Sequence, residues 1–209
     1  MELKNLKINF LGDSITEGQG ASCYENCYVA QFAAMTGAVC RNYGIGGTRI
    51  ARKKVPSENP VFDQDFNGRY DTMDPDADLI VVFGGTNDYG HGDAPIGEMS
   101  DRTVWTFYGA LHSLYTGLIE RWPRSTIVVL TPLHREFEDM DTPHLQPYVD
   151  VIREVAEFYS LPVLDLWASS GLQPRVPINK EIYFADHVHP NDNGHRVIAQ
   201  KLKRFLENM

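Results

Sequence analysis

Short apolar runs alternate with helix-like segments along the chain, and this alternation limits the fold more than any other feature. Five runs are rich in leucine and β-branched residues and mostly lack polar–apolar alternation: residues 8–11, 39–43, 79–83, 127–131 and 162–166. Such runs are typical of strands buried on both faces of a parallel sheet. The sequence therefore predicts a doubly wound, flavodoxin-like α/β domain. We expect three layers (α/β/α), a five-stranded parallel sheet and right-handed crossovers.

Apolar residues recur at helical spacing between these runs. The positions are Tyr28, Phe32 and Met35; Val104, Phe107, Leu111, Leu114 and Leu118; Tyr148, Val151, Val155 and Tyr159; and Val197, Ile198, Leu202, Phe205 and Leu206. The last pattern predicts a helix that starts near Asn191 and Asp192 and buries its apolar face. No repeat, low-complexity tract or linker divides the 209 residues, so we expect a single domain over residues 1–209.

Charge and composition argue against several classes of partner. The chain has 28 acidic and 19 basic residues, and a net charge of −9 disfavours binding to nucleic acid or to an anionic membrane surface. No apolar run approaches the roughly 18 residues of a membrane span, and the N-terminus lacks a signal-peptide profile. Cys23, Cys27 and Cys40 form no CxxC pair, which disfavours a disulfide framework or a structural zinc site. We therefore expect a cytoplasmic protein, of an oligomeric state that no pattern indicates.

Small and polar residues follow three of the predicted strands. They are Gly12-Asp13-Ser14, Gly44-Ile45-Gly46-Gly47-Thr48 and Gly84-Gly85-Thr86-Asn87-Asp88. Ligands of open α/β sheets bind in the crevice beyond these strand ends. Because glycines let backbone amides approach a ligand and an asparagine amide is a neutral donor, this edge suits a developing oxyanion. A purely structural interpretation is also open: Asp13 and Ser14 can cap a helix, and the glycines can serve ordinary turns.

A serine nucleophile at this edge would need a general base, normally a histidine oriented by a third group. The chain has seven histidines. We expect His112 to be half-exposed within a helix and His195 to lie in the first turn of the last helix. Three others, which lie in loops where histidines are usually solvated, are His91, His134 and His144.

The segment 185–192 differs from these, because an acid and a histidine lie three residues apart in a loop that a proline holds. Asp186 can fold back so that its carboxylate meets one ring nitrogen of His189 and leaves the other free. Metal binding is the competing interpretation. Its ligands would be Asp186, His187, His189 and Asp192.

The chain resembles the SGNH hydrolases, also called GDSL-type lipases, acylhydrolases or esterases. The family's four blocks occur in order over nearly the whole length: Gly12-Asp13-Ser14, Asn42-Tyr43-Gly44-Ile45-Gly46-Gly47, Gly85-Thr86-Asn87-Asp88 and Asp186-His187-Val188-His189-Pro190. Each block falls at a predicted strand end or in the loop before the last helix. Two positions depart from the family pattern: Ile15 stands where the family's name implies leucine, and His187 where a small residue is common.

This resemblance implies a serine hydrolase that cleaves esters without a metal or an organic cofactor. It makes Ser14 the nucleophile, His189 the base and Asp186 the partner that orients the base. Spacing and the following proline favour His189 over His187 as the base. The implied oxyanion hole consists of the Ser14 amide, the Gly47 amide and the Asn87 side chain.

Long loops are expected to surround the same edge of the sheet, at residues 52–78, 89–101 and 134–142. They lack the continuous apolar stretches of a fatty-acyl channel, which favours short acyl groups, such as acetyl esters of a sugar or another polar alcohol. Candidate contacts to this small-molecule or saccharide ester are Tyr89, His91, Trp105, His134 and Arg135. The aromatic residues among them can also serve core packing.

Two further functions remain open at this point. One is a metal-dependent hydrolase built on Asp186, His187 and His189; the other is a non-catalytic module that binds carbohydrate or phosphate at the glycine-rich edge. Sensitivity to a chelator would favour the first, whereas covalent labelling of Ser14 by a fluorophosphonate would favour the serine enzyme.

Overall fold

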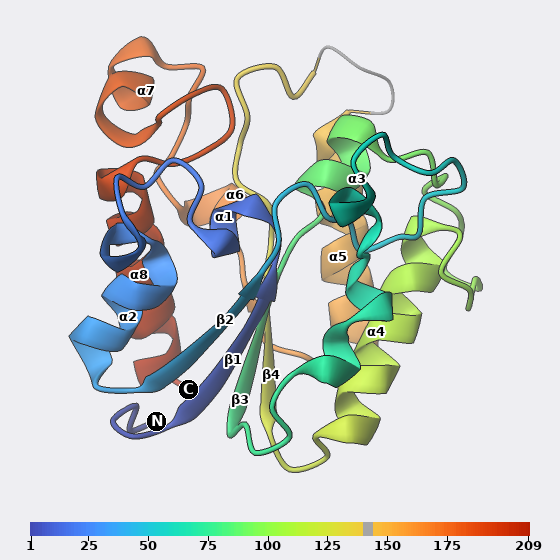
Figure 1. The fold of residues 1–209 in the computed structure, drawn as a ribbon, viewed down its shortest axis with the longest axis horizontal. Coiled ribbons are helices and arrows are strands. Elements are labelled where there is room, and N and C mark those ends of the chain that lie inside the picture. The colour runs from blue at the N-terminus through green and yellow to red at the C-terminus, as the bar shows by residue number, and fades with distance from the viewer. Residues whose placement is uncertain (140–143) are drawn as a thin grey trace.

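A five-stranded parallel sheet, in the order β2-β1-β3-β4-β5, forms the centre of the computed structural model, which describes residues 1–139 and 144–209 (Figure 1). The strands are β1 (Lys7–Gly12), β2 (Val39–Gly44), β3 (Leu79–Phe83), β4 (Thr126–Leu130) and β5 (Val163–Leu164). Strand order changes direction at β1, because β2 lies on one side of it and β3 on the other. The predicted doubly wound α/β fold is confirmed.

Helices cover both faces of the sheet. On one face α2 (Tyr28–Thr36) contacts α8 (Asp192–Glu207), and α4 (Phe107–Arg121) with α5 (Leu145–Phe158) covers the other (Figure 1). These four helices are the ones that the apolar spacing predicts. The shorter helices are α1 (Ser14–Glu17), α3 (Thr86–His91), α6 (Leu166–Ser169) and α7 (Pro177–Tyr183), with 3₁₀ turns η1 (Tyr24–Asn26), η2 (Pro60–Asp63), η3 (Phe66–Gly68) and η4 (Tyr70–Thr72).

Among the element boundaries that differ from the predicted ones, two do so because a side chain caps a helix. Val104 lies outside α4, since the Thr106 hydroxyl accepts the Gly109 N–H and starts the helix there. Strand β5 ends before the run 162–166 does, since the Asp165 side chain accepts the Ala168 N–H and begins α6. Of the predicted loop 134–142, residues 140–142 lie outside the described residues.

Alternate residues of each central strand enter different cores, which explains why these strands are apolar throughout. Ile80 and Val82 pack into the core on the side of α4 and α5. Val81 and Phe83 pack into the core on the side of α2 and α8. Both faces of the sheet are therefore buried against apolar side chains, as expected for the middle of a parallel sheet.

His112 is buried rather than half-exposed, which corrects the expectation from its helical pattern. Its side chain, with 1% of the residue exposed, faces the end of α5. The His112 Nδ1 and the Tyr159 hydroxyl lie 3.0 Å apart, and the Phe158 ring packs edge-on against the imidazole. His112 therefore joins α4 to α5.

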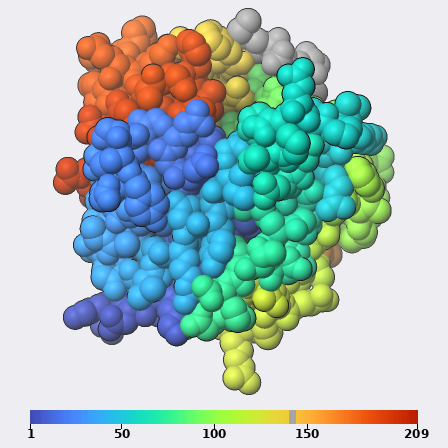
Figure 2. Space-filling view, in the orientation of Figure 1, coloured from blue at the N-terminus to red at the C-terminus, as the bar shows by residue number. Residues whose placement is uncertain are grey.

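The carboxyl ends of the central strands lie at one level, because Gly12 pairs with Gly44 on β2 and with Phe83 on β3. The segments that follow these ends meet at one edge of the sheet (Figure 1). In the space-filling view the N-terminal segment in blue lies directly against the C-terminal segment in orange (Figure 2). Within the described part of the chain, no helix has both the length and the apolar character needed to cross a membrane.

Candidate active site

Ser14 lies at the start of α1, immediately after the turn that ends β1. Asp13 caps this short helix, because its carboxylate accepts the Ile15 N–H at 3.1 Å. Close packing of the turn against β2 requires glycine: a Cβ at Gly44 would lie 2.1 Å from the Glu17 nitrogen. Ser14 is buried, with 3% of the residue exposed.

His189 and Asp186 reach Ser14 from the loop between α7 and α8. The Ser14 Oγ lies 2.9 Å from His189 Nε2, and His189 Nδ1 lies 2.7 Å from Asp186 Oδ2. An ionised carboxylate can only accept, so the proton of a neutral His189 ring is on Nδ1. Its Nε2 then carries the lone pair that faces the Ser14 hydroxyl, as a general base requires.

The Asp186 carboxylate is held by its own loop. Its Oδ1 accepts the N–H groups of Val188 and His189, each at 2.7 Å. Burial alone would raise the pKa of Asp186, but these hydrogen bonds and the one from the His189 ring outweigh it, and the pKa is lowered. Asp186 is therefore ionised near neutral pH.

The loop that carries both residues is closed at its base. Phe184 and Pro190 form an antiparallel bridge, and the Ala185 N–H donates to the His189 carbonyl at 2.9 Å. Asn191 then caps α8 with its side chain. These contacts fix the histidine relative to the sheet.

His187 lies in the same loop but does not converge with Asp186 and His189. Its ring contacts the Glu136 carboxylate and the Lys180 ammonium instead. Asp192, the fourth residue of the predicted metal set, accepts the Ser22 N–H at 2.7 Å. Within residues 1–139 and 144–209, no group of three His, Cys, Asp or Glu side chains is arranged to hold a metal ion. The donor geometry thus gives the metal alternative no support.

A pocket of about 390 Å³ opens over Ser14. Its lining residues are Ser14, Glu17, Gln19, Gly46, Gly47, Val61, Phe62, Asn87, His91 and His189. Gly47 has φ +74°, and a Cβ there would lie 2.4 Å from the Phe62 ring, so this position needs glycine on two grounds. The Asn87 side chain donates one amide hydrogen to the Thr48 carbonyl at 2.9 Å, which leaves its second amide hydrogen for another acceptor.

Of the five predicted substrate contacts, the structure brings His91 to this pocket. The other four are not among the described residues that line it. Tyr89 is buried at 8% exposure, and its hydroxyl donates to the Phe137 carbonyl. Trp105 is 43% exposed and packs against Arg52.

His134 and Arg135 also have structural partners outside the pocket. His134 Nδ1 lies 2.9 Å from the buried Glu138 carboxylate, and its ring lies against Trp167. Arg135 donates to the Thr86 carbonyl at 3.1 Å. Sequence position alone could not separate these residues from His91, since all fall in stretches that the sequence predicts to be polar loops, whereas in the structure His91 ends α3.

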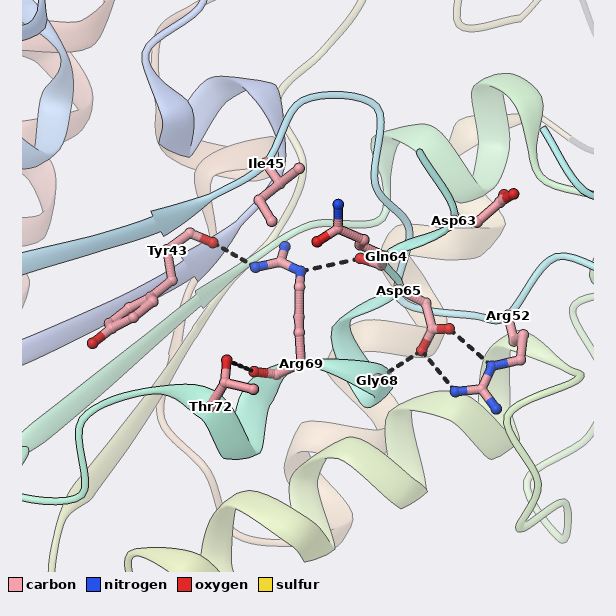
Figure 3. A pocket seen from close by; sticks show the side chains of 9 residues that line it. All are labelled: Tyr43, Ile45, Arg52, Asp63, Gln64, Asp65, Gly68, Arg69 and Thr72. Carbon is pink, nitrogen blue, oxygen red and sulfur yellow. Dashed lines mark hydrogen bonds and ion pairs between the residues drawn. The ribbon is translucent and has the colours of Figure 1, made fainter. Parts of the chain in front are cut away.

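Arg69 supports the site in a way that no sequence signal indicates. Its guanidinium donates to the carbonyls of Gly12 at 2.7 Å and Tyr43 at 2.5 Å, and to the Thr48 hydroxyl at 3.1 Å. It also lines a neighbouring pocket of about 520 Å³ (Figure 3). Burial lowers the pKa of Arg69 to about 10, so the group stays charged at neutral pH. A charged donor thus joins the carboxyl ends of β1 and β2 to the loop that follows β2.

Two buried carboxyl groups, Asp13 and Asp88, lie in the segments that follow β1 and β3. Asp88 accepts the N–H groups of Ile50 at 3.0 Å and Ala51 at 2.8 Å, and so ties the loop after β2 to α3. Burial, with a contribution from the Asp88 charge, raises the pKa of Asp13 to about 7. Burial also raises the pKa of Asp88 to about 6. Both carboxyl groups therefore accept hydrogen bonds from backbone N–H groups of the site and hold them in place.

Comparison with known proteins agrees with the fold. The sequence profile of the GDSL-like Lipase/Acylhydrolase family matches residues 10–197. No curated protein sequence matches the chain. A solved structure of a protein from Lactobacillus plantarum is 34% identical, with a TM-score of 0.86 over 99% of this chain and 98% of that one.

Two more distant structures share the fold. A member of the lipolytic protein G-D-S-L family from Veillonella parvula is 20% identical, with a TM-score of 0.67 over 98% of this chain and 100% of that one. The lipase/acylhydrolase from Enterococcus faecalis is also 20% identical, with a TM-score of 0.65 over 97% and 96% of the two chains.

Proposed function

The chain belongs to the GDSL-like Lipase/Acylhydrolase family, a family of ester hydrolases, and we propose that it cleaves carboxylic esters through an acyl-enzyme on Ser14. One observation carries the proposal: the line of contacts from Ser14 Oγ through the His189 ring to Asp186, at 2.9 and 2.7 Å. A nucleophile, a base and an acid that orients the base are the three parts that this chemistry needs.

In the first half of the reaction, the Ser14 oxygen attacks the ester carbonyl carbon while His189 Nε2 takes the hydroxyl proton. Asp186 stabilises the imidazolium that forms. The negative charge on the former carbonyl oxygen is met by the Ser14 and Gly47 amides and the Asn87 side chain. The intermediate then expels the alcohol, which receives its proton from His189.

In the second half, a water molecule attacks the acyl carbon and gives a proton to His189. The carbonyl oxygen again carries the charge and meets the same donors. Collapse releases the carboxylic acid and returns the proton to Ser14. One ester and one water give one acid and one alcohol, and the enzyme is regenerated.

A fluorophosphonate probe tests the nucleophile. It is expected to label Ser14 and no other serine, as read by peptide mass spectrometry. Ser14→Ala is expected to abolish both the labelling and the hydrolysis of p-nitrophenyl acetate. A Ser14→Ala protein that cleaved this ester at the wild-type rate would contradict the proposal.

We further propose that the acyl group is short, such as acetyl, and that the alcohol is a carbohydrate or another polar alcohol. The support is the character of the pocket, where Val61 and Phe62 are the large apolar side chains among mostly polar or small lining residues. A series of p-nitrophenyl esters from acetate to decanoate tests the acyl part. We expect kcat/KM to fall as the chain lengthens; a rise towards long chains would overturn the assignment.

A further inference from the structure

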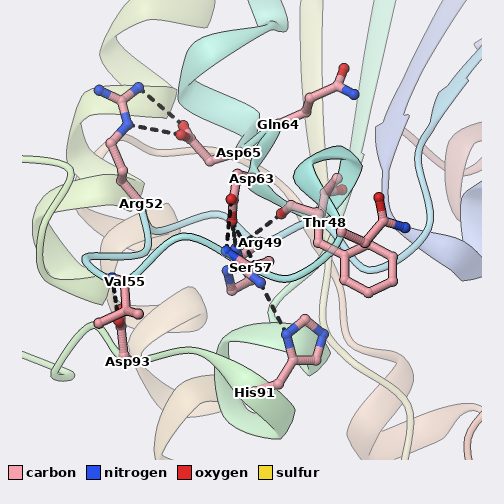
Figure 4. A network of polar contacts seen from close by, with 12 residues as sticks. Thr48, Arg49, Arg52, Val55, Ser57, Asp63, Gln64, Asp65, His91 and Asp93 are labelled. Atoms are coloured by element: carbon pink, nitrogen blue, oxygen red, sulfur yellow. Dashed lines mark hydrogen bonds and ion pairs between the residues drawn. The ribbon is translucent and has the colours of Figure 1, made fainter.

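His91 lines the pocket over Ser14 but has no task in the steps described so far. It is the last residue of α3, and its ring is tilted against Phe62 on the wall of the pocket. On its other side, His91 Nδ1 lies 3.0 Å from Nη1 of Arg49 (Figure 4). This contact determines the tautomer of the imidazole ring at the wall of the pocket.

Arg49 is an unusual neighbour for a histidine because it is buried, with 1% of the residue exposed. Its Nη2 donates to the Phe62 carbonyl at 2.9 Å and to Asp63 Oδ1 at 3.0 Å, which fixes the guanidinium in place (Figure 4). A guanidinium has only donors and does not lose its proton in proteins. The Nδ1 atom of His91 must therefore be the acceptor in this contact.

It follows that the proton of His91 is on Nε2, the nitrogen on the other edge of the ring. Protonation of Nδ1 as well would break the hydrogen bond and set an imidazolium beside the Arg49 charge. Partial burial, followed by Arg49, lowers the pKa of His91. The ring is thus a neutral hydrogen-bond donor with one defined tautomer.

The other polar groups of the pocket complement this donor. Glu17 supplies a carboxylate and Gln19 an amide, and no lysine or arginine occurs among the described residues that line the pocket. A hydroxyl-bearing alcohol can accept from a neutral N–H and donate to a carboxylate. A phosphate or carboxylate substituent would instead meet the charge of Glu17, and Arg49 behind His91 is buried and already paired with Asp63.

From this arrangement we propose that His91 is a specificity-determining residue, whose Nε2–H donates to an oxygen of the alcohol part of the ester and so selects uncharged, hydroxyl-bearing alcohols. Arg49 is the positioning residue that sets the tautomer. The inference rests on the proposed function and goes beyond it, because it names the group that distinguishes one ester from another.

The first test compares two acetates of primary alcohols on a six-membered ring, one rich in hydroxyl groups and one without any: methyl 6-O-acetylglucoside and cyclohexylmethyl acetate. The readout is the ratio of kcat/KM for the sugar ester to that for the cyclohexyl ester, from acetate release. His91→Phe keeps a ring of similar size without a donor and is expected to lower this ratio roughly three- to ten-fold, as for one neutral hydrogen bond. His91→Gln, which keeps a donor, is expected to recover part of it. The control is His144→Phe, at an exposed histidine outside the pocket, with an unchanged ratio.

The second test reads the tautomer without any substrate. Nitrogen-15 NMR of histidine-labelled protein at pH 7 is expected to show His91, assigned by its loss in His91→Gln, as a neutral ring protonated on Nε2. A ring protonated on Nδ1 or on both nitrogens would overturn the inference, as would a ratio that His91→Phe leaves unchanged. If wild-type protein cleaves neither acetate and takes no fluorophosphonate label, the proposed function fails as well, which separates the two outcomes.

Discussion

The geometry around Asn87 illustrates how a single side chain is set at this site. One of its amide hydrogens is used by the Thr48 carbonyl, which leaves the side chain one orientation in the pocket. Such fixed donors stabilise a transition state because they need no reorganisation when charge develops.

Asn87→Ala is expected to lower kcat roughly 10²- to 10³-fold on p-nitrophenyl acetate, because one donor to the oxyanion is lost. Asn87→Asp is the matched control for shape: it keeps the size of the side chain, cannot donate when ionised, and is expected to lose at least as much. Urea unfolding of each variant separates a catalytic loss from a folding loss. Retention of near wild-type kcat in both variants would remove Asn87 from the oxyanion hole.

Asp186→Asn is expected to lower kcat by roughly 10³- to 10⁴-fold. The reason is the tautomer of His189: an amide that turns its N–H towards Nδ1 favours a proton on Nε2, the nitrogen that must accept from Ser14. Steady-state kinetics with p-nitrophenyl acetate measures the effect, and Asp150→Asn, on the exposed side of α5, is the control. A variant with a tenth of the wild-type kcat would show that Asp186 does not orient the base.

At the scale of the elements, the site depends on three strand ends that are tied together by buried polar side chains. Arg69 joins carbonyls at the carboxyl ends of β1 and β2, and Asp88 joins α3 to the loop after β2. Ser14, Gly47 and Asn87 lie on these three segments, so their relative positions depend on such ties.

Arg69→Met is expected to destabilise the fold by about 1–3 kcal/mol per carbonyl left without its donor, and to lower kcat/KM at least ten-fold. Urea unfolding and p-nitrophenyl acetate kinetics measure the two effects. Arg124→Met makes the same chemical change at an exposed position between α4 and β4, where neither quantity should change. Equal effects in the two variants would argue against a positioning role for Arg69.

The elements themselves were largely predictable from sequence. Strands buried on both faces leave uninterrupted apolar runs, and helices such as α5 and α8 leave a clear period, so both types were located. Residues at strand ends were also found, because the position of a site in an open sheet follows from topology. Arg49 and Arg69 were not found, since an arginine in a polar loop looks the same in sequence whether it is solvated or buried. Sequence also does not show whether a loop side chain points into the pocket or away from it. Trp105 and His134, both predicted contacts, are not among the described residues that line the pocket.

At the scale of the whole molecule, the last helix is joined to the N-terminal third of the chain through a buried histidine. His195 Nδ1 accepts the Tyr28 N–H, and its Nε2 donates to the Gln19 carbonyl, each at 3.2 Å. His195 is 0% exposed, and burial lowers its pKa to about 4.

The single-domain organisation and the cytoplasmic location stay predictions.

His195 makes part of the stability depend on pH. Between about pH 6.5 and 4 the unfolded chain binds a proton at this position whereas the folded protein does not, so its contribution falls as the pH falls. The unfolding free energy of wild type minus that of His195→Gln is expected to drop by about 3 kcal/mol from pH 7 to pH 4. Taking the difference cancels the opposite trend of Asp13, whose raised pKa makes stability fall as the pH rises. A difference that is constant over this range would show that the pKa of His195 is the same in the folded and the unfolded state.

The hydrogen bond between Ser14 and His189 spans 175 residues of sequence. During synthesis on the ribosome, Ser14, the proposed nucleophile, emerges long before His189, the proposed base, and the loop that carries His189 is closed only when α8 begins. A partly made chain therefore carries an ordinary, unreactive serine. In refolding, esterase activity should return only when the last helix docks, which is later than the formation of the sheet. The activity is then a measure of how much of the chain has completed its fold.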